Sequence, residues 1–227
     1  MKLIVAGNGK TGALVTEIAR ERGHQVSILT SVGNAHGRGL NKLALRGVDA
    51  VIDFTRPDAV LENIAACARA RVNMVVGTTG WYDHLGEVRK IIEQHGIGFV
   101  YASNFSVGMN LFFKLAAAAA PAARYGYTAA ITEKHHSGKK DAPSGTAIRL
   151  QQIIDEHGGG KPQITSIREG DFAGIHTIRL ESSEDTITLA HDAKTRRGFA
   201  AGALRAAEWL HGKRGFHDFS EVLGIEK

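Results

Sequence analysis

The fold is decided by KLIVAGNGKTG at residues 2–12, where an apolar run leads directly into a glycine-rich turn. Leu3–Ala6 predicts a buried strand, and the apolar spacing over residues 11–22 predicts a helix. The turn between them has the spacing G-x-G-x-x-G, whose glycines allow a tight turn and let a pyrophosphate approach the N-terminus of the helix. We therefore predict a dinucleotide-binding turn formed by Gly7, Asn8, Gly9, Lys10, Thr11 and Gly12.

Two other interpretations of this turn remain open from the residues alone. Gly9-Lys10-Thr11 also matches the end of a phosphate-binding P-loop, and Asp53 after its apolar run could imitate the aspartate that accompanies such a loop. A P-loop needs a further glycine where this chain has Ile4, so a nucleotide triphosphatase is the weaker hypothesis. The other alternative is a glycine-rich turn that binds no ligand.

The rest of the first hundred residues alternates short apolar runs with helical patterns. Strands are predicted at residues 25–30, 48–54, 73–76 and 98–101, and helices at residues 58–71 and 85–95. Strands separated by helices of about 10–15 residues indicate right-handed βαβ units and a parallel sheet. We predict an α/β fold with a Rossmann-like doubly wound dinucleotide-binding domain over residues 1–104.

The pattern changes after residue 104. An alanine-rich helix is predicted over residues 107–123, a strand over 128–133 and a helix over 144–157, while residues 164–168, 175–181 and 186–191 alternate as antiparallel strands do. These elements predict a smaller α+β domain, with a mixed or antiparallel sheet, over residues 105–199. A last helix at residues 200–211 is expected to return to the first domain, which residues 200–227 complete.

Composition excludes several classes of protein. The chain has 227 residues, of which 43% are hydrophobic and 22% charged, and this is ordinary for a globular protein and too apolar for disorder. Its single cysteine, Cys67, excludes an internal disulfide framework and fits a reducing compartment. The apolar run at residues 111–123 is shorter than the about 20 residues that a membrane helix needs.

Charge and the first residues narrow the location and the partners. Gly7 interrupts the first apolar run too early for a secretory signal, so a cytoplasmic protein is expected. The net charge of +5 is scattered along the chain, which favours an acidic small-molecule partner over nucleic acid or a membrane surface.

The densest chemical stretch is EKHHSGKKDAPSGTA at residues 133–147. A histidine with a nearby lysine suits proton transfer close to neutral pH. The stretch runs into a predicted helix, which Asp141 or Ser144 can cap and Pro143 can start, and whose first N–H groups can bind an anion. A solvated basic loop is the alternative.

A metal site is not predicted. His135 and His136 are adjacent, so in an extended segment their side chains point to opposite sides and do not naturally chelate one ion. No third ligand stands at the spacing that zinc sites use.

The chain resembles the 4-hydroxy-tetrahydrodipicolinate reductase (dihydrodipicolinate reductase) family of bacterial lysine and diaminopimelate biosynthesis. The resemblance covers nearly the whole chain and is carried in family order by the glycine turn, by VIDFT at 51–55, VGTTG at 76–80, ASNFSVG at 102–108, the block at 133–147, GIHT at 174–177, HDAKTR at 191–196 and FAAGA at 199–203.

The resemblance implies an NAD(P)H-dependent oxidoreductase that converts 4-hydroxy-tetrahydrodipicolinate to tetrahydrodipicolinate with loss of water. By position, His135 would be the catalytic acid/base and Lys139 the proton donor. The residues that hold or border the substrate carboxylates would be His136, Ser144, Gly145, Thr146 and Arg196. The cofactor contacts beyond the turn would be Phe54, Gly77, Thr78, Thr79, Ala102, Ser103, Asn104 and Phe105.

The resemblance also implies that the domain over residues 105–199 serves substrate binding and oligomerisation, with a homotetramer built through its sheet. The stretch between residues 158 and 168 is shorter than in most members of the family, which leaves a dimer as the alternative. Two rival functions remain beside the reductase: another enzyme on the same scaffold, such as an amino-acid dehydrogenase, and a non-catalytic dinucleotide sensor. The histidine–lysine block argues against the sensor, which has no use for a proton donor.

The cofactor preference follows from a missing carboxylate. In dinucleotide folds an Asp or Glu about 20 residues after the glycines binds the ribose 2′-hydroxyl and repels a 2′-phosphate. No carboxylate occurs between Glu21 and Asp49, whereas Thr30, Ser31 and the cations Lys10 and Arg38 could bind a phosphate. We therefore expect NADPH to be preferred over NADH.

Overall fold

The computed structural model describes residues 1–34 and 37–225. Its internal contacts divide the chain into two compact units. Unit 1 comprises Met1–Ser106 and Arg197–Lys227, and unit 2 comprises Val107–Arg196. The boundaries expected from the sequence are residues 104 and 199.

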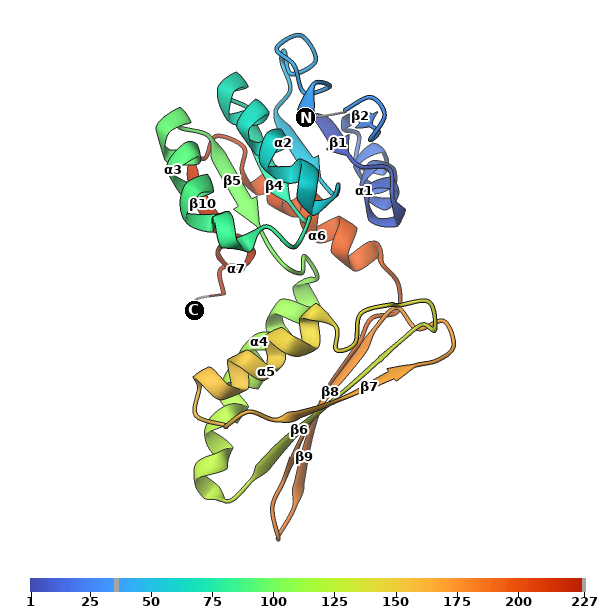
Figure 1. Cartoon of the computed structure of the whole chain (residues 1–227), viewed down its shortest axis with the longest axis vertical. Coiled ribbons are helices and arrows are strands. Elements are labelled where there is room, and N and C mark those ends of the chain that lie inside the picture. Colours follow the sequence, from blue (N-terminus) through green and yellow to red (C-terminus); the bar gives the residue numbers. More distant parts are fainter. Residues whose placement is uncertain (35–36, 226–227) are drawn as a thin grey trace. The chain divides into compact units, whose positions relative to one another are not determined.

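Unit 1 contains a parallel sheet of six strands in the order β10-β5-β4-β3-β1-β2 (Figure 1). The strands are β1 (Lys2–Ala6), β2 (Gln25–Leu29), β3 (Ala50–Asp53), β4 (Asn73–Val76), β5 (Gly98–Tyr101) and β10 (Gly215–Asp218). The central strands β1, β3, β4 and β5 are almost entirely buried, because helices cover both faces of a parallel sheet.

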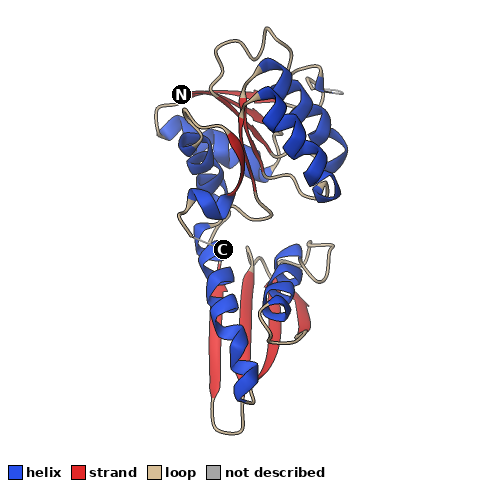
Figure 2. Ribbon diagram, turned by 90° about the vertical axis from the view of Figure 1, so that its left-hand side faces the viewer, coloured by secondary structure: helices blue, strands red, loops and turns tan. Residues whose placement is uncertain are grey.

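The helices of unit 1 form two layers, one on each face of the sheet (Figure 2). On one face α1 (Lys10–Glu21) and α6 (Arg197–Trp209) share a core with Leu3, Val5 and Ile52. On the other face α2 (Pro57–Ala70) and α3 (Leu85–His95) share a core with Ile4, Val51 and Met74. A short 3₁₀ turn, η2 (Tyr82–His84), precedes α3, and α7 (Phe219–Val222) follows β10. The doubly wound, Rossmann-like fold is confirmed.

Unit 2 is a sheet of four strands in the order β7-β6-β8-β9, with two helices on one face (Figures 1 and 2). The strands are β6 (Thr128–His135), β7 (Gln163–Arg168), β8 (Ile175–Glu181) and β9 (Thr186–Asp192). The helices are α4 (Val107–Ala119), which continues as the 3₁₀ turn η3 (Ala120–Tyr125), and α5 (Gly145–Glu156). Their apolar sides bury Ile131, Ile178 and Leu180 of the sheet.

The sheet of unit 2 is mixed. Strand β7 pairs in parallel with β6, so the expectation that residues 164–168 form an antiparallel strand is wrong. The cause is α5, which lies between β6 and β7 in the chain and returns it to the same end of the sheet. Strands β8 and β9 are antiparallel, as expected.

Three of the differences from the sequence predictions have a clear cause or consequence. The long helix stops being α-helical at Ala119, two residues before Pro121, whose ring does not fit an α-helix interior. Strand β10 was not predicted because GFHD is short and lies at the edge of the sheet. Strand β6 extends to His135, which is therefore part of the sheet and not of the loop that follows.

Among the described residues, no helix combines the length and the apolar character needed to cross a membrane.

Candidate active site

The glycine-rich turn of unit 1 packs tightly against its neighbours. Gly7 has a φ of 101°, which strains any residue with a side chain, and a Cβ there would lie 2.3 Å from the carbonyl oxygen of Phe54. A Cβ at Gly12 would lie 2.0 Å from the carbonyl oxygen of Gly7. These two glycines therefore let the turn, β3 and α1 approach one another closely.

Gly9 differs from the other two glycines because, apart from its neighbours along the chain and its own helix, no atom of residues 1–34 and 37–225 lies within 4 Å of the place that its Cβ would take. It is the N-cap residue of α1 and offers no side chain to cap the N–H groups of the first turn. Such N–H groups and the helix dipole attract an anion. The open space, with exposed Asn8 and Lys10 beside it, fits a pyrophosphate.

Asp53, at the end of β3, organises the neighbouring loops. Its buried carboxylate accepts hydrogen bonds from Thr55 N and Oγ1 at 2.9 and 2.7 Å, from Thr78 Oγ1 at 2.7 Å and from Asn63 Nδ2 at 2.7 Å. Burial raises the pKa of Asp53, and these hydrogen bonds act against the rise. Asn34, in the loop after β2, donates to Asn63 Oδ1 at 2.7 Å and so joins that loop to the same network.

The turn after β4 is shaped by Phe54. A Cβ at Gly77 would lie 2.2 Å from the Phe54 ring, so only glycine lets this ring lie against the turn. Phe105 meets the Phe54 ring edge-on with 6.3 Å between the centroids, and it is only 2% exposed. The side chain of Phe105 thus belongs to the core, where it also packs on Phe219.

The expected cofactor residues share one edge of the sheet. They follow the carboxyl ends of β1, β3, β4 and β5, which meet at the same edge because the strands are parallel. The crevice at this edge is where open α/β sheets bind dinucleotides. Thr79 and Ser103 are exposed there, Thr78 and Ala102 are buried, and Asn104 Oδ1 accepts from Ser106 N at 2.8 Å.

In unit 2, a buried carboxylate lies at the centre of the histidine–lysine block. Glu133 Oε1 accepts hydrogen bonds from the Arg168 guanidinium at 2.6 Å and from Ser144 N at 3.4 Å, and Oε2 contacts His135 Nδ1. Burial would raise the pKa of Glu133, but hydrogen bonds from Arg168 and Ser166 and the nearby positive charges lower it to about 2. Glu133 is therefore ionised at neutral pH.

The ionised carboxylate fixes the tautomer of His135. Its Nδ1 must carry the proton that Glu133 accepts, which leaves Nε2 as the atom that can take up a proton. Burial lowers the pKa of His135. The positive charges of Lys139 and Arg168 also lower it, whereas the charge of Glu133 raises it. Because the pKa lies below its ordinary value, the ring is neutral at pH 7. A Cβ at Gly174 would lie 2.9 Å from Nε2, and glycine at this position keeps the space beside the atom open.

Glu133→Gln tests this arrangement. Without the carboxylate, the charge that raises the pKa of His135 is gone, so we expect the acidic limb of the pH profile of kcat/KM to move to lower pH. We also expect kcat to fall about tenfold or more, because the preferred tautomer is no longer fixed. A fall in kcat with an unmoved acidic limb would contradict a positioning role.

The start of α5 is capped by Ser144. Its Oγ accepts from Ala147 N at 3.2 Å and lies 3.3 Å from His176 Nε2, so the hydroxyl is engaged within the protein. Pro143 precedes the cap and does not start the helix, and Asp141 does not cap it, because Ser144 already holds that position. Apart from its chain neighbours and the backbone of α5, no described residue has an atom within 4 Å of the Cβ position of Gly145, which leaves the backbone at the helix start open to an anion.

The remaining expected site residues form two pairs. Lys139 Nζ donates to both oxygens of Asp141 at 2.8 and 2.9 Å. Arg196 donates to His136 Nε2 at 3.2 Å, which makes that nitrogen an acceptor. Arg168 also donates to the carbonyl oxygen of Asp141 at 2.6 Å and thereby joins the Lys139 loop to Glu133. The structure thus gathers His135, His136, Lys139, Ser144, Gly145, Thr146 and Arg196 around the ends of β6 and α5.

Glu133, His135 and His176 have the arrangement of a metal-binding triad, since each places a ligand atom within 4.8 Å of the others. Sequence spacing did not reveal it, because His176 lies on β8, opposite Glu133. The guanidinium of Arg168 already binds Glu133 and would repel a cation. His176 Nε2 lies 3.3 Å from Ser144 Oγ, and its Nδ1 is buried without a hydrogen-bond partner among the described residues.

His176 should make stability depend on pH. Burial lowers its pKa to about 4, with help from the charge of His135. Unfolding returns the pKa of His176 to its ordinary value near 6.5. The contribution of this group to the free energy of unfolding is therefore fully present above pH 6.5 and is lost as the pH drops towards 4. Between pH 7 and 5 we expect a loss of about 2 kcal/mol from this group.

Urea unfolding at pH 7 and 5 measures this loss. His176→Asn should show a smaller fall in the free energy of unfolding than the wild type, whereas the control His211→Asn, at an exposed position, should keep the full fall. An equal fall in all three proteins would show that His176 is not the group responsible.

Three residues of this site were not predicted from the sequence to have a role in it: Glu133, Arg168 and His176. Glu133 stands two positions before His135, so strand periodicity was a signal for a shared face. Arg168 pairs with His135 across β6 and β7, and this register is visible only in the folded chain.

Comparisons with known proteins identify the family. Two models match, dihydrodipicolinate reductase, N-terminus, over residues 1–105, and dihydrodipicolinate reductase, C-terminus, over residues 108–223. A 4-hydroxy-tetrahydrodipicolinate reductase from Christiangramia forsetii is 37% identical and covers 98% of each chain. Another, from Laribacter hongkongensis, is 38% identical and covers 92% of this chain and 84% of its own length.

Solved structures agree with this. A dipicolinate-bound dihydrodipicolinate reductase from Paenisporosarcina sp. TG-14 has a TM-score of 0.80 and 25% identity, covering 97% of this chain and 98% of its own. An engineered D-amino acid dehydrogenase bound to NADP⁺ has a TM-score of 0.56 at 10% identity, covering 100% of this chain and 97% of its own. The second likeness shows the fold alone.

Proposed function

The chain belongs to the dihydrodipicolinate reductase family, and we propose that it reduces 4-hydroxy-tetrahydrodipicolinate to tetrahydrodipicolinate with NADPH as the preferred cofactor, releasing water. The observation that carries this proposal is the Glu133–His135 pair beside Lys139 and the start of α5. This arrangement places groups that can transfer a proton next to hydrogen-bond donors that can hold a substrate with two carboxylates.

The substrate is held by its two carboxylates. The N–H groups of Gly145 and Thr146 at the start of α5 receive one of them, since a helix N-terminus favours an anion. Arg196, which holds the His136 ring, offers a guanidinium for the other. Ser144 takes part as the cap that fixes the start of the helix. The solved dihydrodipicolinate reductase from Paenisporosarcina sp. TG-14 is bound to dipicolinate, which, like the proposed substrate, carries two carboxylates.

Proton transfer is assigned to His135 and Lys139. A bound reduced nicotinamide supplies the hydride, and the ring that receives it needs a proton from the protein. Lys139 Nζ is the proposed proton donor. It pairs with Asp141, and a bound substrate would compete with Asp141 for it. His135 Nε2 exchanges a proton with the leaving hydroxyl or with the ring, while Glu133 stabilises the charged imidazole.

The cofactor is assigned to the carboxyl edge of the sheet of unit 1. Gly9 and the start of α1 would hold the pyrophosphate, and Gly77, Thr78 and Thr79 would border the nicotinamide. A 2′-phosphate would meet the loop after β2, where no carboxylate stands and where Thr30 Oγ1 is within 3.4 Å of Gly33 N. Asn34 holds this loop to the Asp53 network.

NADPH should have the higher kcat/KM of the two cofactors at moderate ionic strength. Lys10→Ala should cost NADPH more than NADH, because only NADPH carries the extra phosphate; we expect a difference of about twofold to fivefold from one exposed charge pair. Steady-state kinetics with both cofactors measures it. A clear advantage for NADH in the wild type would refute the preference.

We propose a homotetramer in the cytoplasm, with a dimer as the alternative assembly. The face of the unit 2 sheet opposite α4 and α5 exposes Ala130, Thr132 and Arg179 and is free of helices, so it is available to a second copy. The buried free thiol of Cys67 fits a reducing compartment.

The proposed function is tested by an assay with freshly generated 4-hydroxy-tetrahydrodipicolinate, in which cofactor absorbance is followed. Oxidation of NADPH that depends on this substrate supports the function. Oxidation with an amino acid or an oxo acid and ammonia, but not with this substrate, would favour the amino-acid dehydrogenase. Binding of NADPH with no turnover of either substrate would favour the dinucleotide sensor.

A further inference from the structure

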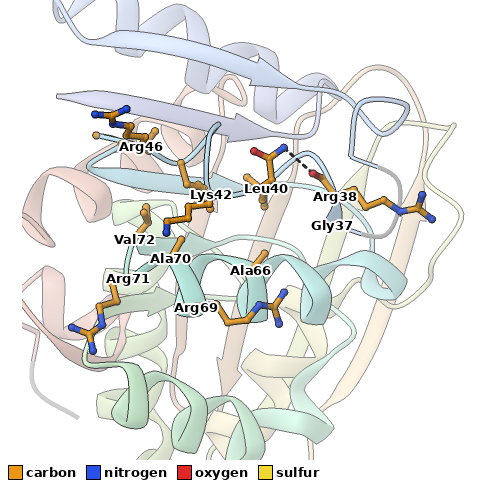
Figure 3. A pocket seen from close by; sticks show the side chains of 14 residues that line it. Gly37, Arg38, Leu40, Lys42, Arg46, Ala66, Arg69, Ala70, Arg71 and Val72 are labelled. Atoms are coloured by element: carbon orange, nitrogen blue, oxygen red, sulfur yellow. Dashed lines mark hydrogen bonds between the residues drawn. The ribbon is translucent and has the colours of Figure 1, made fainter.

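A second cleft in unit 1 lies away from the glycine turn. It has a volume of about 870 Å³ and lies between the loop at residues 37–48 and the last part of α2 (Figure 3). Val48 and Val72, which line it, stand just before β3 and β4. Most of the cleft is therefore at the amino ends of these strands, the edge opposite to the expected cofactor residues.

The cleft carries charge of one sign. Its lining contains five cations and no carboxylate: Arg38, Lys42, Arg46, Arg69 and Arg71. Within residues 1–34 and 37–225, none of these five side chains has an ion pair or a hydrogen bond, whereas cations elsewhere, such as Arg22 and Arg197, pair with glutamates. One-signed charge in a cleft concentrates the field and attracts anions.

The backbone at Arg71 gives an independent reason to connect this cleft with a ligand. Arg71 is the C-cap of α2 with a φ of 57°, and it is the one non-glycine residue with a positive φ among the described residues. Helices α3 and η3 end on Gly96 and Gly126 in the same left-handed region, which glycine adopts without strain. An arginine is held here against the backbone preference, and its side chain lines the cleft (Figure 3).

The length of the cleft and the distribution of the cations over its two walls limit the kind of anion that can bind. Arg38, Lys42 and Arg46 lie on the loop wall, and Arg69 and Arg71 on the helix wall. Gly37 lies against Glu62, and the helix from residue 62 to residue 71 is about 14 Å long, so a single phosphate cannot meet both ends of the cleft. Buried Leu40, Leu45 and Ala66 form an apolar floor.

We propose that this cleft binds a linear polyphosphate anion, as carried by a nucleoside triphosphate or by a chain of inorganic phosphates, at a site that shares only Arg38 with the expected cofactor site. Guanidinium groups bind phosphate oxygens in pairs, and the negative charge of such a chain balances five cations. The volume is that of a small-molecule site, which favours a compact ligand over a nucleic acid or a protein surface.

The test is a calorimetric titration of the protein, saturated with NADPH, with inorganic tripolyphosphate and in parallel with ATP. We expect one binding site in the wild type and about tenfold or more weaker binding in Arg46→Gln/Arg69→Gln/Arg71→Gln. Lys161→Gln/Arg205→Gln, which removes exposed charge elsewhere, should bind as the wild type does. Arg38 is left unchanged because it is also expected near the cofactor 2′-phosphate.

The two probes distinguish the source of the phosphates. Tighter binding of ATP indicates a nucleotide whose base uses the apolar floor, and equal binding indicates the phosphate chain alone. If the triple variant does not fold, Lys42→Gln/Arg46→Gln replaces it, since both changes lie in the loop and leave α2 untouched. No binding to the wild type, or equal affinities in the cleft variant and the control variant, would overturn the proposal.

Discussion

His135→Ala and Lys139→Ala are each expected to lower kcat by about 10²–10⁴-fold, the usual contribution of a general acid or base. The His135→Ala variant lacks the imidazole ring that Glu133 orients. The Lys139→Ala variant lacks the ammonium group that Asp141 holds. Both residues lie in unit 2, while the expected cofactor residues lie in unit 1. The dissociation constant of NADPH, measured by fluorescence titration of the free enzyme, should therefore stay nearly unchanged.

Lys140→Ala is the matched control for Lys139→Ala. Lys140 is the next residue in the same loop, is exposed, and makes no ion pair with any of the described residues, in contrast to Lys139, which pairs with Asp141. Its replacement should change kcat little. Wild-type kcat in both His135→Ala and Lys139→Ala would show that the proton-transfer assignment is wrong.

Gly12→Ala and Gly9→Ala are expected to separate folding from cofactor binding. A Cβ at Gly12 would lie 2.0 Å from the carbonyl oxygen of Gly7, so the backbone must shift, at a cost of about 1–3 kcal/mol or more. Gly12→Ala should therefore lower Tm by about 5 °C or more and also weaken NADPH binding.

Gly9→Ala should leave Tm nearly unchanged, because the new Cβ meets no atom within 4 Å in the described part of the chain other than those of its chain neighbours and its own helix. It should still weaken NADPH binding about tenfold or more, since the methyl group takes the space in which the pyrophosphate meets the start of α1. Calorimetric melting and NADPH titration of both variants measure the two effects. Unchanged NADPH affinity in Gly9→Ala would place the pyrophosphate elsewhere.

The sequence predicts the parts of this protein that depend on neighbours along the chain. The strand, turn and helix over residues 2–22 form where the periodicity and the glycines place them, and α3 runs over residues 85–95 as expected. The parallel order of the first sheet also follows, because helices between successive strands require crossovers. Family motifs add the histidine–lysine block and its expected chemistry.

The parts that were not predicted depend on contacts between distant residues. Strand β7 is parallel because of where α5 returns the chain, and β10 joins the sheet from the far end of the sequence. The partners of Glu133 come from β7 and from the start of α5, so no local pattern shows that this carboxylate is buried and ionised. The five cations of the second cleft are likewise separated by up to 33 positions along the chain, from Arg38 to Arg71.

The most direct test of the proposed reaction is transfer of a labelled hydride. The enzyme is supplied with NADPH carrying deuterium at the transferable position of the nicotinamide and with freshly generated 4-hydroxy-tetrahydrodipicolinate, and the product is analysed by mass spectrometry. We expect tetrahydrodipicolinate that carries one deuterium bound to a ring carbon, in an amount equal to the NADPH oxidised. Oxidation of the labelled cofactor with no deuterium in the ring would contradict direct hydride transfer to this substrate.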